Sequence, residues 1–318
     1  MKNNVSTKTG MLVNKKSSFW RDLMKEKTLL FMAIPFVLYK LLFHYVPISG
    51  WIIAFMNYRP ARSIFDQQWV GWQQFEMLFE DPIFYEVLRN TLAMNVIKLF
   101  LGMIFSILLA LMLNEVRNLL FKKFTQTVSY LPYFISWVVA AGLVLNILSV
   151  DGGIINEVLL RLNIIDKPIM FMGIPELFWW IIGATHVWKT VGYGAIIYLA
   201  SMTSISPSLY EAATIDGASR LQRIWYITLP GIKPVIIILL IMNIGMLMND
   251  GFEQIYLLMN GRVINYARVF TIFELDYGIK MMRFSFATAV GIFRSVVSIV
   301  LVFSANFIAK RMGQERLI

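Results

Sequence analysis

Six long apolar runs constrain this chain more than any other feature of its sequence. Each run is long enough to cross about 30 Å of hydrocarbon as an α-helix. We therefore predict an all-α membrane protein with six transmembrane helices. The predicted spans cover residues 28–56, 88–114, 127–149, 177–200, 235–257 and 285–309.

The composition agrees with this prediction and excludes several kinds of site. The chain has 318 residues, of which 58% are hydrophobic, and its mean hydropathy of +0.65 is far above that of a soluble domain. It contains no cysteine, which excludes disulfides, thiolate metal sites and a cysteine nucleophile. No G-x-x-x-x-G-K-[ST] sequence occurs, so we expect no Walker-type ATP site in this chain. Neither His44 nor His186 has acidic or histidine neighbours at ligand spacing, so no metal site is expected.

Basic residues are distributed unequally between the segments that join the runs. Residues 1–27, 115–126, 201–234 and 310–318 carry sixteen Lys and Arg, whereas the alternate segments 57–87, 150–176 and 258–284 carry eight. Excess Lys and Arg collect on the cytoplasmic side of membrane proteins. We therefore predict that both termini and the loop 201–234 are cytoplasmic, with 1–27 as a tail and 28–318 as the transmembrane domain. The net charge of +10 is explained in this way and does not indicate nucleic-acid binding.

The loop 201–234 begins with signals for a short helix. Ser208 and Glu211 have the spacing of a capping box. Ala212 and Ala213 favour the helix, and Gly217 is placed to end it.

The second half of the same loop predicts another short helix, over residues 219–227. Leu229-Pro230 and Pro234 follow it and are expected to break the chain before the next span, because proline lacks an N–H and clashes in a helix interior. The loop is therefore predicted to be a compact helix–turn–helix at the membrane surface.

Three elements of this loop, Glu211-Ala212-Ala213, Gly217 and Leu229-Pro230, resemble the EAA loop of ABC importer permeases. An isolated E-A-A is common in amphipathic loops, but E-A-A-x3-G-x11-L-P between two spans is specific. In that family the loop is cytoplasmic and its first helix docks into a cleft on the ATPase subunit. The resemblance implies the type I ABC importer permease fold, with coupling residues Ser208, Glu211, Ala212, Ala213, Asp216, Gly217, Leu229 and Pro230. Glu211 either caps its helix or also meets a basic group on the ATPase.

Two predicted outer segments resemble sugar permeases. Residues 70–84 match the pattern V-G-x-x-x-F-x-x-L-F-x-D-P-x-F, and Asn90-Thr91 follows at the start of a span. The turn 151–156 and the sequence F-E-Q at 252–254 are similar to permeases that accompany oligo- and polysaccharide-binding lipoproteins. The resemblance covers most of residues 30–310.

The resemblance also implies partners. It implies a non-enzymatic transport subunit in the cytoplasmic membrane of a prokaryote, with ATP and Mg bound by two separate ATPase subunits and no cofactor in this chain. A second permease subunit and an extracellular solute-binding protein complete the importer. The family favours a distinct homologous chain as the second permease, although a copy of this chain stays open.

Polar and ionisable side chains inside the spans are candidates for the substrate pathway, because such residues are costly in a membrane and mark a pathway or a pair. If 235–257 is one helix, Asn243, Asp250 and Glu253 lie on one stripe. Asp250 and Glu253 alternatively neutralise Lys189 or Arg294. The candidate pathway residues are Lys40, Lys98, His186, Trp188, Lys189, Tyr193, Asn243, Asp250, Glu253 and Arg294.

The sign of these charges suggests a class of cargo. Cations in or near the spans outnumber anions five to two when Arg89 is included. A neutral oligosaccharide needs no positive charge along its path, whereas uronate groups would bind Lys and Arg. The sequence therefore leads to the hypothesis of an oligosaccharide cargo that is acidic.

Two other functions stay open at this point. An ion-driven transporter would use Asp250, Glu253 and His186 as a relay, but it would leave the loop 201–234 without a role. An ABC permease for another solute is opposed only by the sugar-type segments. A membrane enzyme would need a clustered nucleophile and base, and the sequence shows none.

Overall fold

The computed structural model describes residues 27–311, so the predicted tail before Lys27 lies outside the described residues. The chain forms two compact units that divide after Ile52. In the first unit, α2 (Lys27–Lys40) continues into the π-turn η1 (Leu41–Tyr45) and the 3-10 segment η2 (Val46–Phe55), whose last residues belong to the second unit.

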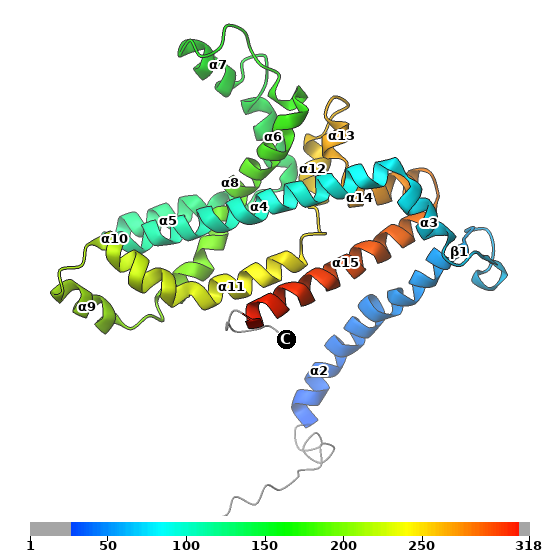
Figure 1. Cartoon of the computed structure of the whole chain (residues 1–318), viewed down its shortest axis with the longest axis horizontal. Helices are drawn as coiled ribbons and strands as arrows, with labels where there is room; N and C mark the ends of the chain where they lie inside the picture. Colours follow the sequence, from blue (N-terminus) through cyan, green and yellow to red (C-terminus); the bar gives the residue numbers. More distant parts are fainter. Residues whose placement is uncertain (1–26, 312–318) are drawn as a thin grey trace, which may run out of the picture. The chain divides into compact units, whose positions relative to one another are not determined.

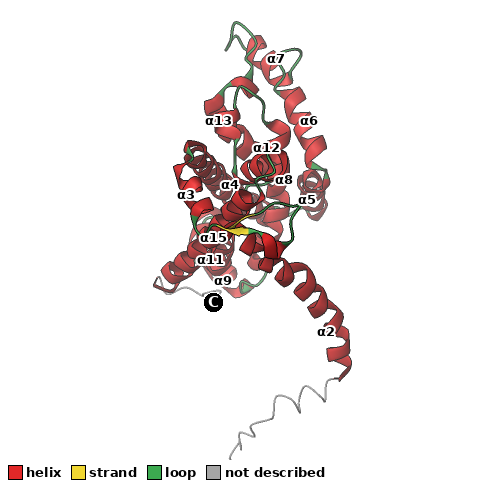
Figure 2. Cartoon of the chain, turned by 90° about the vertical axis from the view of Figure 1, so that its right-hand side faces the viewer, coloured by secondary structure: helices red, strands yellow, loops and turns green. Residues whose placement is uncertain are grey.

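The second unit is built almost entirely of helices (Figure 1). One short antiparallel ladder pairs β1 (Met56–Asn57) with β2 (Gln68–Trp69) and is drawn in yellow in Figure 2. The long helices are α4 (Pro82–Glu115), α8 (Pro175–Met202), α11 (Leu229–Gly245) and α15 (Phe284–Arg311). The shorter helices are α3 (Gln73–Glu80), α5 (Leu119–Phe134), α6 (Trp137–Ile147), α7 (Ile154–Arg161), α9 (Pro207–Ile215), α10 (Arg220–Arg223), α12 (Phe252–Leu258), α13 (Ile264–Ala267) and α14 (Phe270–Glu274).

Helix α8 is the centre of the packing in this unit, with α4 and α5 along its sides, while α11 packs on α15. Small residues allow the helices to approach closely. A Cβ atom on Gly192 of α8 would clash with the carbonyl oxygen of Ser129 in α5, and one on Gly183 would meet Ile97 of α4. The backbones of α5 and α8 are therefore in direct contact.

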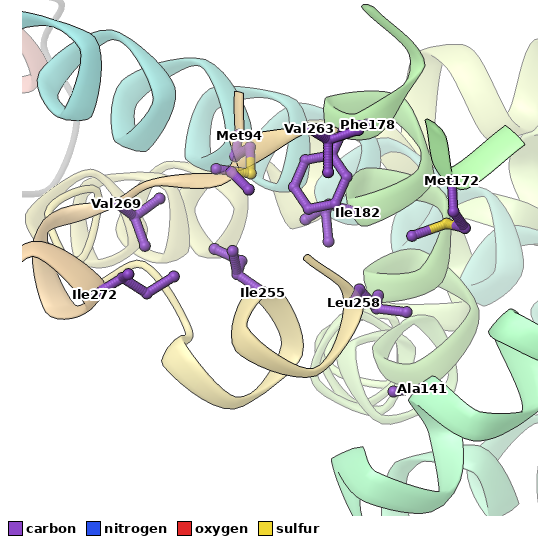
Figure 3. Close-up of a cluster of buried hydrophobic side chains, with 11 residues drawn as sticks. Met94, Ala141, Met172, Phe178, Ile182, Ile255, Leu258, Val263, Val269 and Ile272 are labelled. Atoms are coloured by element: carbon purple, nitrogen blue, oxygen red, sulfur yellow. The ribbon is translucent and has the colours of Figure 1, made fainter. Parts of the chain in front are cut away.

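One apolar core fixes the region around α12 (Figure 3). Phe178 and Ile182 of α8 pack in it with Met94 of α4 and with Ile255 and Leu258 of α12. All five side chains are almost completely buried. This core holds the short α12 against α4 and α8.

The predicted number of spans is matched only in part. Four segments are long and apolar enough to cross a membrane, namely Lys27–Phe55, Pro82–Glu115, Arg220–Gly245 and Phe284–Arg311, and the bent pair α5–α6 would be a fifth. Helix α8 has 28 residues, which is long enough by length alone. The count of six spans stays a prediction.

The continuous span predicted over 127–149 is wrong, because α5 and α6 meet at an angle of 102°. Pro132 lies in the last turn of α5 and has no N–H for the helix ladder. Ser136 then starts α6 by accepting a hydrogen bond from the N–H of Val139. The span is therefore broken at Ile135.

The continuous span predicted over 235–257 is also wrong. Helix α11 ends at Gly245, and α12 begins only at Phe252, after Gly251 with a left-handed φ of 68°. Asn243, Asp250 and Glu253 therefore do not share one helical stripe. Side chains from other helices bond the carbonyl groups that this interruption frees, as described below.

The chain break predicted at Leu229-Pro230 and Pro234 is wrong, because the helix continues through these residues. Residues 220–245 form one helical segment of 26 residues. A π-helical turn, η5 (Ile224–Thr228), lies directly before Leu229. Its wider hydrogen-bond pattern accommodates Pro230, which has no N–H to donate and whose ring would clash in a regular helix.

Candidate functional site: a polar cavity and an exposed loop

Two adjacent cavities lie between α4, α8 and α11. One of about 270 Å³ is lined by Asn95, Lys98 and Gln254, and the other of about 280 Å³ by Thr190 and Tyr193. Leu99, His186 and Asn243 line both, so we treat them together as the cavity pair. Four of the predicted pathway residues, Lys98, His186, Tyr193 and Asn243, thus come together in it. Amide, imidazole, hydroxyl and ammonium groups there can bind a ligand that carries many hydroxyl groups.

Lys98 connects this cavity pair to the interruption after α11. Its Nζ donates to the carbonyl oxygen of Asp250 at 2.8 Å and lies 3.4 Å from Oδ1 of Asn95. The amide of Asn95 donates to the carbonyl oxygen of Leu247. Lys98 therefore both bonds the broken backbone and presents its charge at the cavity wall.

Lys189 is placed differently. Its Nζ donates to the carbonyl oxygens of Pro132, Tyr133 and Ile135 at 3.2, 2.8 and 2.6 Å. An ammonium group has three N–H donors, so all of them are engaged at the end of α5. Nζ also lies 5.7 Å from the ring centre of Tyr133 and 5.2 Å from that of Trp137. These contacts favour a structural role for Lys189.

Arg294 is engaged in the same way at the other interruption. Its guanidinium bonds both carboxylate oxygens of Glu274 at 2.8 and 2.9 Å and donates to the carbonyl oxygen of Met248. Glu274 lies in the segment 258–284, which is predicted to be an outer loop, so the sequence does not predict its pairing with Arg294 of α15.

The predicted pairing of Asp250 with Lys189 or Arg294 is not found. The carboxylate of Asp250 is fully buried and accepts hydrogen bonds from the backbone N–H and the hydroxyl group of Thr271. This anchors the interruption after α11 to the start of α14.

Of the three remaining pathway candidates, two belong to the second unit and lie outside the cavity pair, and one belongs to the first unit. Glu253 is exposed, and Trp188 lines two separate apolar cavities. Lys40 belongs to the first unit, where its Nζ lies 3.4 Å from Nε2 of His44.

Sequence reasoning missed several contributors to the cavity pair, among them Trp137 and Gln254. Trp137 follows the break between α5 and α6, and Gln254 lies in α12 with its amide donating to the carbonyl oxygen of Ile182. Gln254 is an amide in an apolar run, which is the signal that could have identified it. Within residues 27–311, no group of three or more His, Cys, Asp and Glu is arranged to hold a metal ion.

The loop 201–234 presents α9 at the end of the second unit away from α3 and the start of α15 (Figure 1). The capping box predicted at Ser208 and Glu211 is wrong, because Pro207 is the first helical residue and Ser206 is the N-cap. Oγ of Ser208 bonds Oγ of Ser206 instead, at 2.8 Å. A complete capping box forms one helix later, between Ser219 and Gln222.

The predicted helix end at Gly217 is found. Gly217 has φ of 73°, and the N–H of Ala218 donates to the carbonyl oxygen of Ala213 at 2.8 Å, as in a Schellman motif. Asp216 is the C-cap of α9, and both Glu211 and Ala212 are exposed.

Two hydrogen bonds hold α9 on the following helix. The hydroxyl groups of Tyr210 and Thr228 lie 3.0 Å apart, and Arg223 donates to Oγ1 of Thr214 at 3.1 Å. Ile215 at the tip is 87% exposed, which is unusual for a large apolar side chain. The arrangement is a short, firmly held helix with an uncovered apolar end.

The chain that combines this polar cavity between helices with an exposed helical loop is similar to known proteins. Residues 102–314 match the family described as binding-protein-dependent transport system inner membrane component. The chain belongs to this family of ABC importer permeases. A relative in Bacillus subtilis (strain 168), the polygalacturonan/rhamnogalacturonan transport system permease protein YteP, is 44% identical over 92% of this chain and 91% of its own. Protein LplB of the same organism is 39% identical, and the match covers 96% of each chain.

A solved structure shows the same fold. The crystal structure of a bacterial alginate ABC transporter in complex with an alginate pentasaccharide-bound periplasmic protein contains a chain that is 36% identical to this permease. The match has a TM-score of 0.85 and covers 95% of this chain and 100% of that chain. The type I importer fold expected from the sequence is thereby supported across nearly the whole length.

Proposed function

We propose that this permease imports an oligosaccharide that bears uronate groups, by alternating access driven by ATP. The observation that carries the proposal is the Lys98 ammonium group at the wall of the cavity pair. Relatives named for polygalacturonan and rhamnogalacturonan transport and for alginate support an acidic carbohydrate as the cargo.

The contacts of the cations refine the charge argument. Lys189 and Arg294 are engaged by backbone carbonyl oxygens and by Glu274, so their charges serve the fold. Lys98 faces the cavity and has one strong bond, to the carbonyl oxygen of Asp250. We therefore assign the attraction of a uronate carboxylate to Lys98, with Asn243 and Tyr193 binding hydroxyl groups and ring faces.

The loop 201–234 is proposed to couple the cavity to the ATPase. Its exposed α9 would dock on one of two ATPase subunits, which bind ATP and Mg, and both termini would lie on the same cytoplasmic side. The second permease subunit is proposed to be a distinct homologous chain, and an extracellular binding protein to deliver the cargo. The continuous helix from Arg220 to Gly245 joins the loop to Asn243 in the cavity. ATP binding would then favour the outward-facing state of two pre-existing states.

The test of the cargo uses the complete importer reconstituted in vesicles. In Lys98→Met, we expect uptake of a galacturonate oligosaccharide to fall about tenfold, which corresponds to about 1.4 kcal/mol for one charge-assisted hydrogen bond. Uptake of a neutral oligosaccharide of equal length should fall much less, and Lys98→Arg should retain most acidic uptake. Equal losses for both cargoes would contradict the acidic cargo.

The test of coupling measures ATP hydrolysis in the same vesicles. Gly217→Pro cannot keep φ at 73°, so it should misplace the end of α9 and abolish both uptake and cargo-stimulated hydrolysis. Glu211→Lys should weaken both by reversing an exposed charge on α9. Uptake that continues without ATP, or that ignores both substitutions in correctly inserted protein, would contradict ATP coupling through this loop.

A further inference from the structure

A third polar cavity, of about 390 Å³, lies outside the cavity pair and shares no residue with it. It is lined by β1 and the residues after it, by α3 and by the start of α15, at the end of the second unit away from α9 (Figure 1). Its polar lining includes Asn57, Arg59, Gln73, Gln74 and Arg283. Its volume is within the range of about 300–1,000 Å³ that small-molecule sites have.

Gln74 is the first indication that this cavity holds a ligand. Its side chain is only 7% exposed, and it lines the cavity. No hydrogen bond joins this amide to another group among residues 27–311. No buried side-chain nitrogen or oxygen atom of these residues lacks a partner, so the amide atoms of Gln74 reach the space of the cavity, where they can bond a ligand.

The start of α15 is the second indication. The backbone N–H groups of Phe284, Ser285 and Phe286 have no acceptor within the described chain, whereas the N–H of Ala287 donates to the carbonyl oxygen of Arg283. These three residues line the same cavity. Free N–H groups at the N-terminus of a helix of 28 residues favour an anion.

The two arginines supply the charge. The guanidinium carbon of Arg283 lies 4.6 Å from the ring centre of Phe286 and 5.3 Å from that of Tyr277, which holds it in place. Neither Arg283 nor Arg59 has an ion-pair partner within residues 27–311. Tyr277 stays neutral beside Arg283, because burial and the hydrogen bond to Asp81 raise the pKa of Tyr277 to about 12. Both positive charges are therefore available to a ligand.

We propose that this cavity is a second sugar-acid site, which binds the carboxylate of a uronate residue between the N-terminus of α15, Arg59 and Arg283. The site would hold a distal unit of the oligosaccharide on the outer side while another unit occupies the cavity pair. This role rests on the proposed acidic cargo. The three amides Asn57, Gln73 and Gln74 offer acceptors as well as donors, which suits sugar hydroxyl groups. A lipid phosphodiester group carries no hydroxyl hydrogen of its own, so only a lipid whose headgroup adds hydroxyl groups would use those acceptors.

The experiment measures binding of digalacturonate to the complete importer in nanodiscs of zwitterionic lipid, without ATP and without the binding protein. We expect Gln74→Leu and Arg283→Gln each to weaken one class of binding events about tenfold, as loss of a charge-assisted or buried hydrogen bond predicts. Lys98→Met should leave that class unchanged, and a neutral disaccharide should not compete. Thr288→Ala, at a hydroxyl group in α15 that bonds only the carbonyl oxygen of Phe284, is the matched control and should bind normally.

Three outcomes would overturn the site. Digalacturonate binding that is identical in wild type, Gln74→Leu and Arg283→Gln would show that the cavity takes no uronate. Competition by a neutral disaccharide would show that the carboxylate is not recognised. Anionic lipid that displaces digalacturonate, and that is itself lost from Arg283→Gln, would assign the cavity to a headgroup. If digalacturonate binds as expected but acidic oligosaccharides are not taken up, the proposed function fails and the site stands.

Discussion

Two of the predicted spans of this permease are interrupted, and cationic side chains bond the freed carbonyl groups at the two interruptions in different ways. Between α5 and α6, the ammonium group of Lys189 donates hydrogen bonds to the carbonyl oxygens of Pro132, Tyr133 and Ile135. After α11, the freed carbonyl groups are divided between Arg294, which bonds Met248, and Lys98, which bonds Asp250. The first interruption is therefore closed by one saturated ammonium group, whereas the second leaves a cation at the cavity wall.

The difference shows how a buried charge in a membrane protein can be assigned. Freed backbone carbonyl groups need donors, and the lipid of the membrane core supplies none. Lys189 and Arg294 meet that need completely, so their positions follow from the broken helices. Lys98 meets it with its charge still at the cavity, and this is the arrangement expected of a residue that also binds cargo.

The largest effect is expected for Arg294→Met. The substitution leaves the carboxylate of Glu274 and the carbonyl oxygen of Met248 without their donor. The pair is partly buried, so removing one partner should cost about 3 kcal/mol, the lower end of the range for a buried pair, and the detergent-purified protein should unfold at a markedly lower temperature. Adding Glu274→Gln should recover part of the loss. An unchanged unfolding temperature would contradict a structural role for Arg294.

Lys189→Met should lower the free energy of unfolding by less, about 1–3 kcal/mol, because it leaves carbonyl groups without a donor. Acidic and neutral cargoes should be affected alike, because Lys189 contacts α5 and lies outside the lining of the cavity pair. The two roles are separated by measuring the unfolding temperature and the uptake of both cargoes in Lys189→Met and in Lys98→Met. Selective loss of acidic uptake in Lys189→Met would remove the distinction between the two interruptions.

The smallest of these effects is expected for Gly192→Ala, which tests the close contact between α5 and α8. The added methyl group would clash with the carbonyl oxygen of Ser129 and push away the helix that Lys189 caps. Overpacking of this kind costs about 1–3 kcal/mol, and relaxation of α5 should keep the value near the lower limit. Gly142→Ala in α6 is the matched control, because nothing lies within 4 Å of its Cβ position. Equal unfolding temperatures for the two variants would show that the contact is not tight.

The sequence predicts the membrane class, the loop 201–234 and four residues of the cavity pair, because hydropathy and short-range spacing carry these features. It does not predict the interruptions. The run 235–257 is as apolar as a continuous span, and only distant side chains such as Arg294 and Lys98 make its interruption stable.

Contacts between residues distant in the sequence also change the count of charges in and near the spans. Glu274 lies far from Arg294 in the sequence and outside the apolar runs, so the excess of cations over anions was overestimated. At Pro230 the sequence predicts an interruption that the structure does not have. Local helix propensity indicates a break there, but the π-turn at Ile224–Thr228 accommodates the proline ring, and the helix continues.

That continuous helix has a geometric consequence. Its 26 residues extend about 39 Å at 1.5 Å per residue, with Arg220 at the loop and Asn243 near the other end. A rotation of about 5° at the loop would displace the far end by about 3 Å, roughly the length of one hydrogen bond. Under the proposed coupling, angular changes too small to disturb packing at one end would exchange whole binding partners at the other, and the cavity would respond as a switch between discrete contact sets.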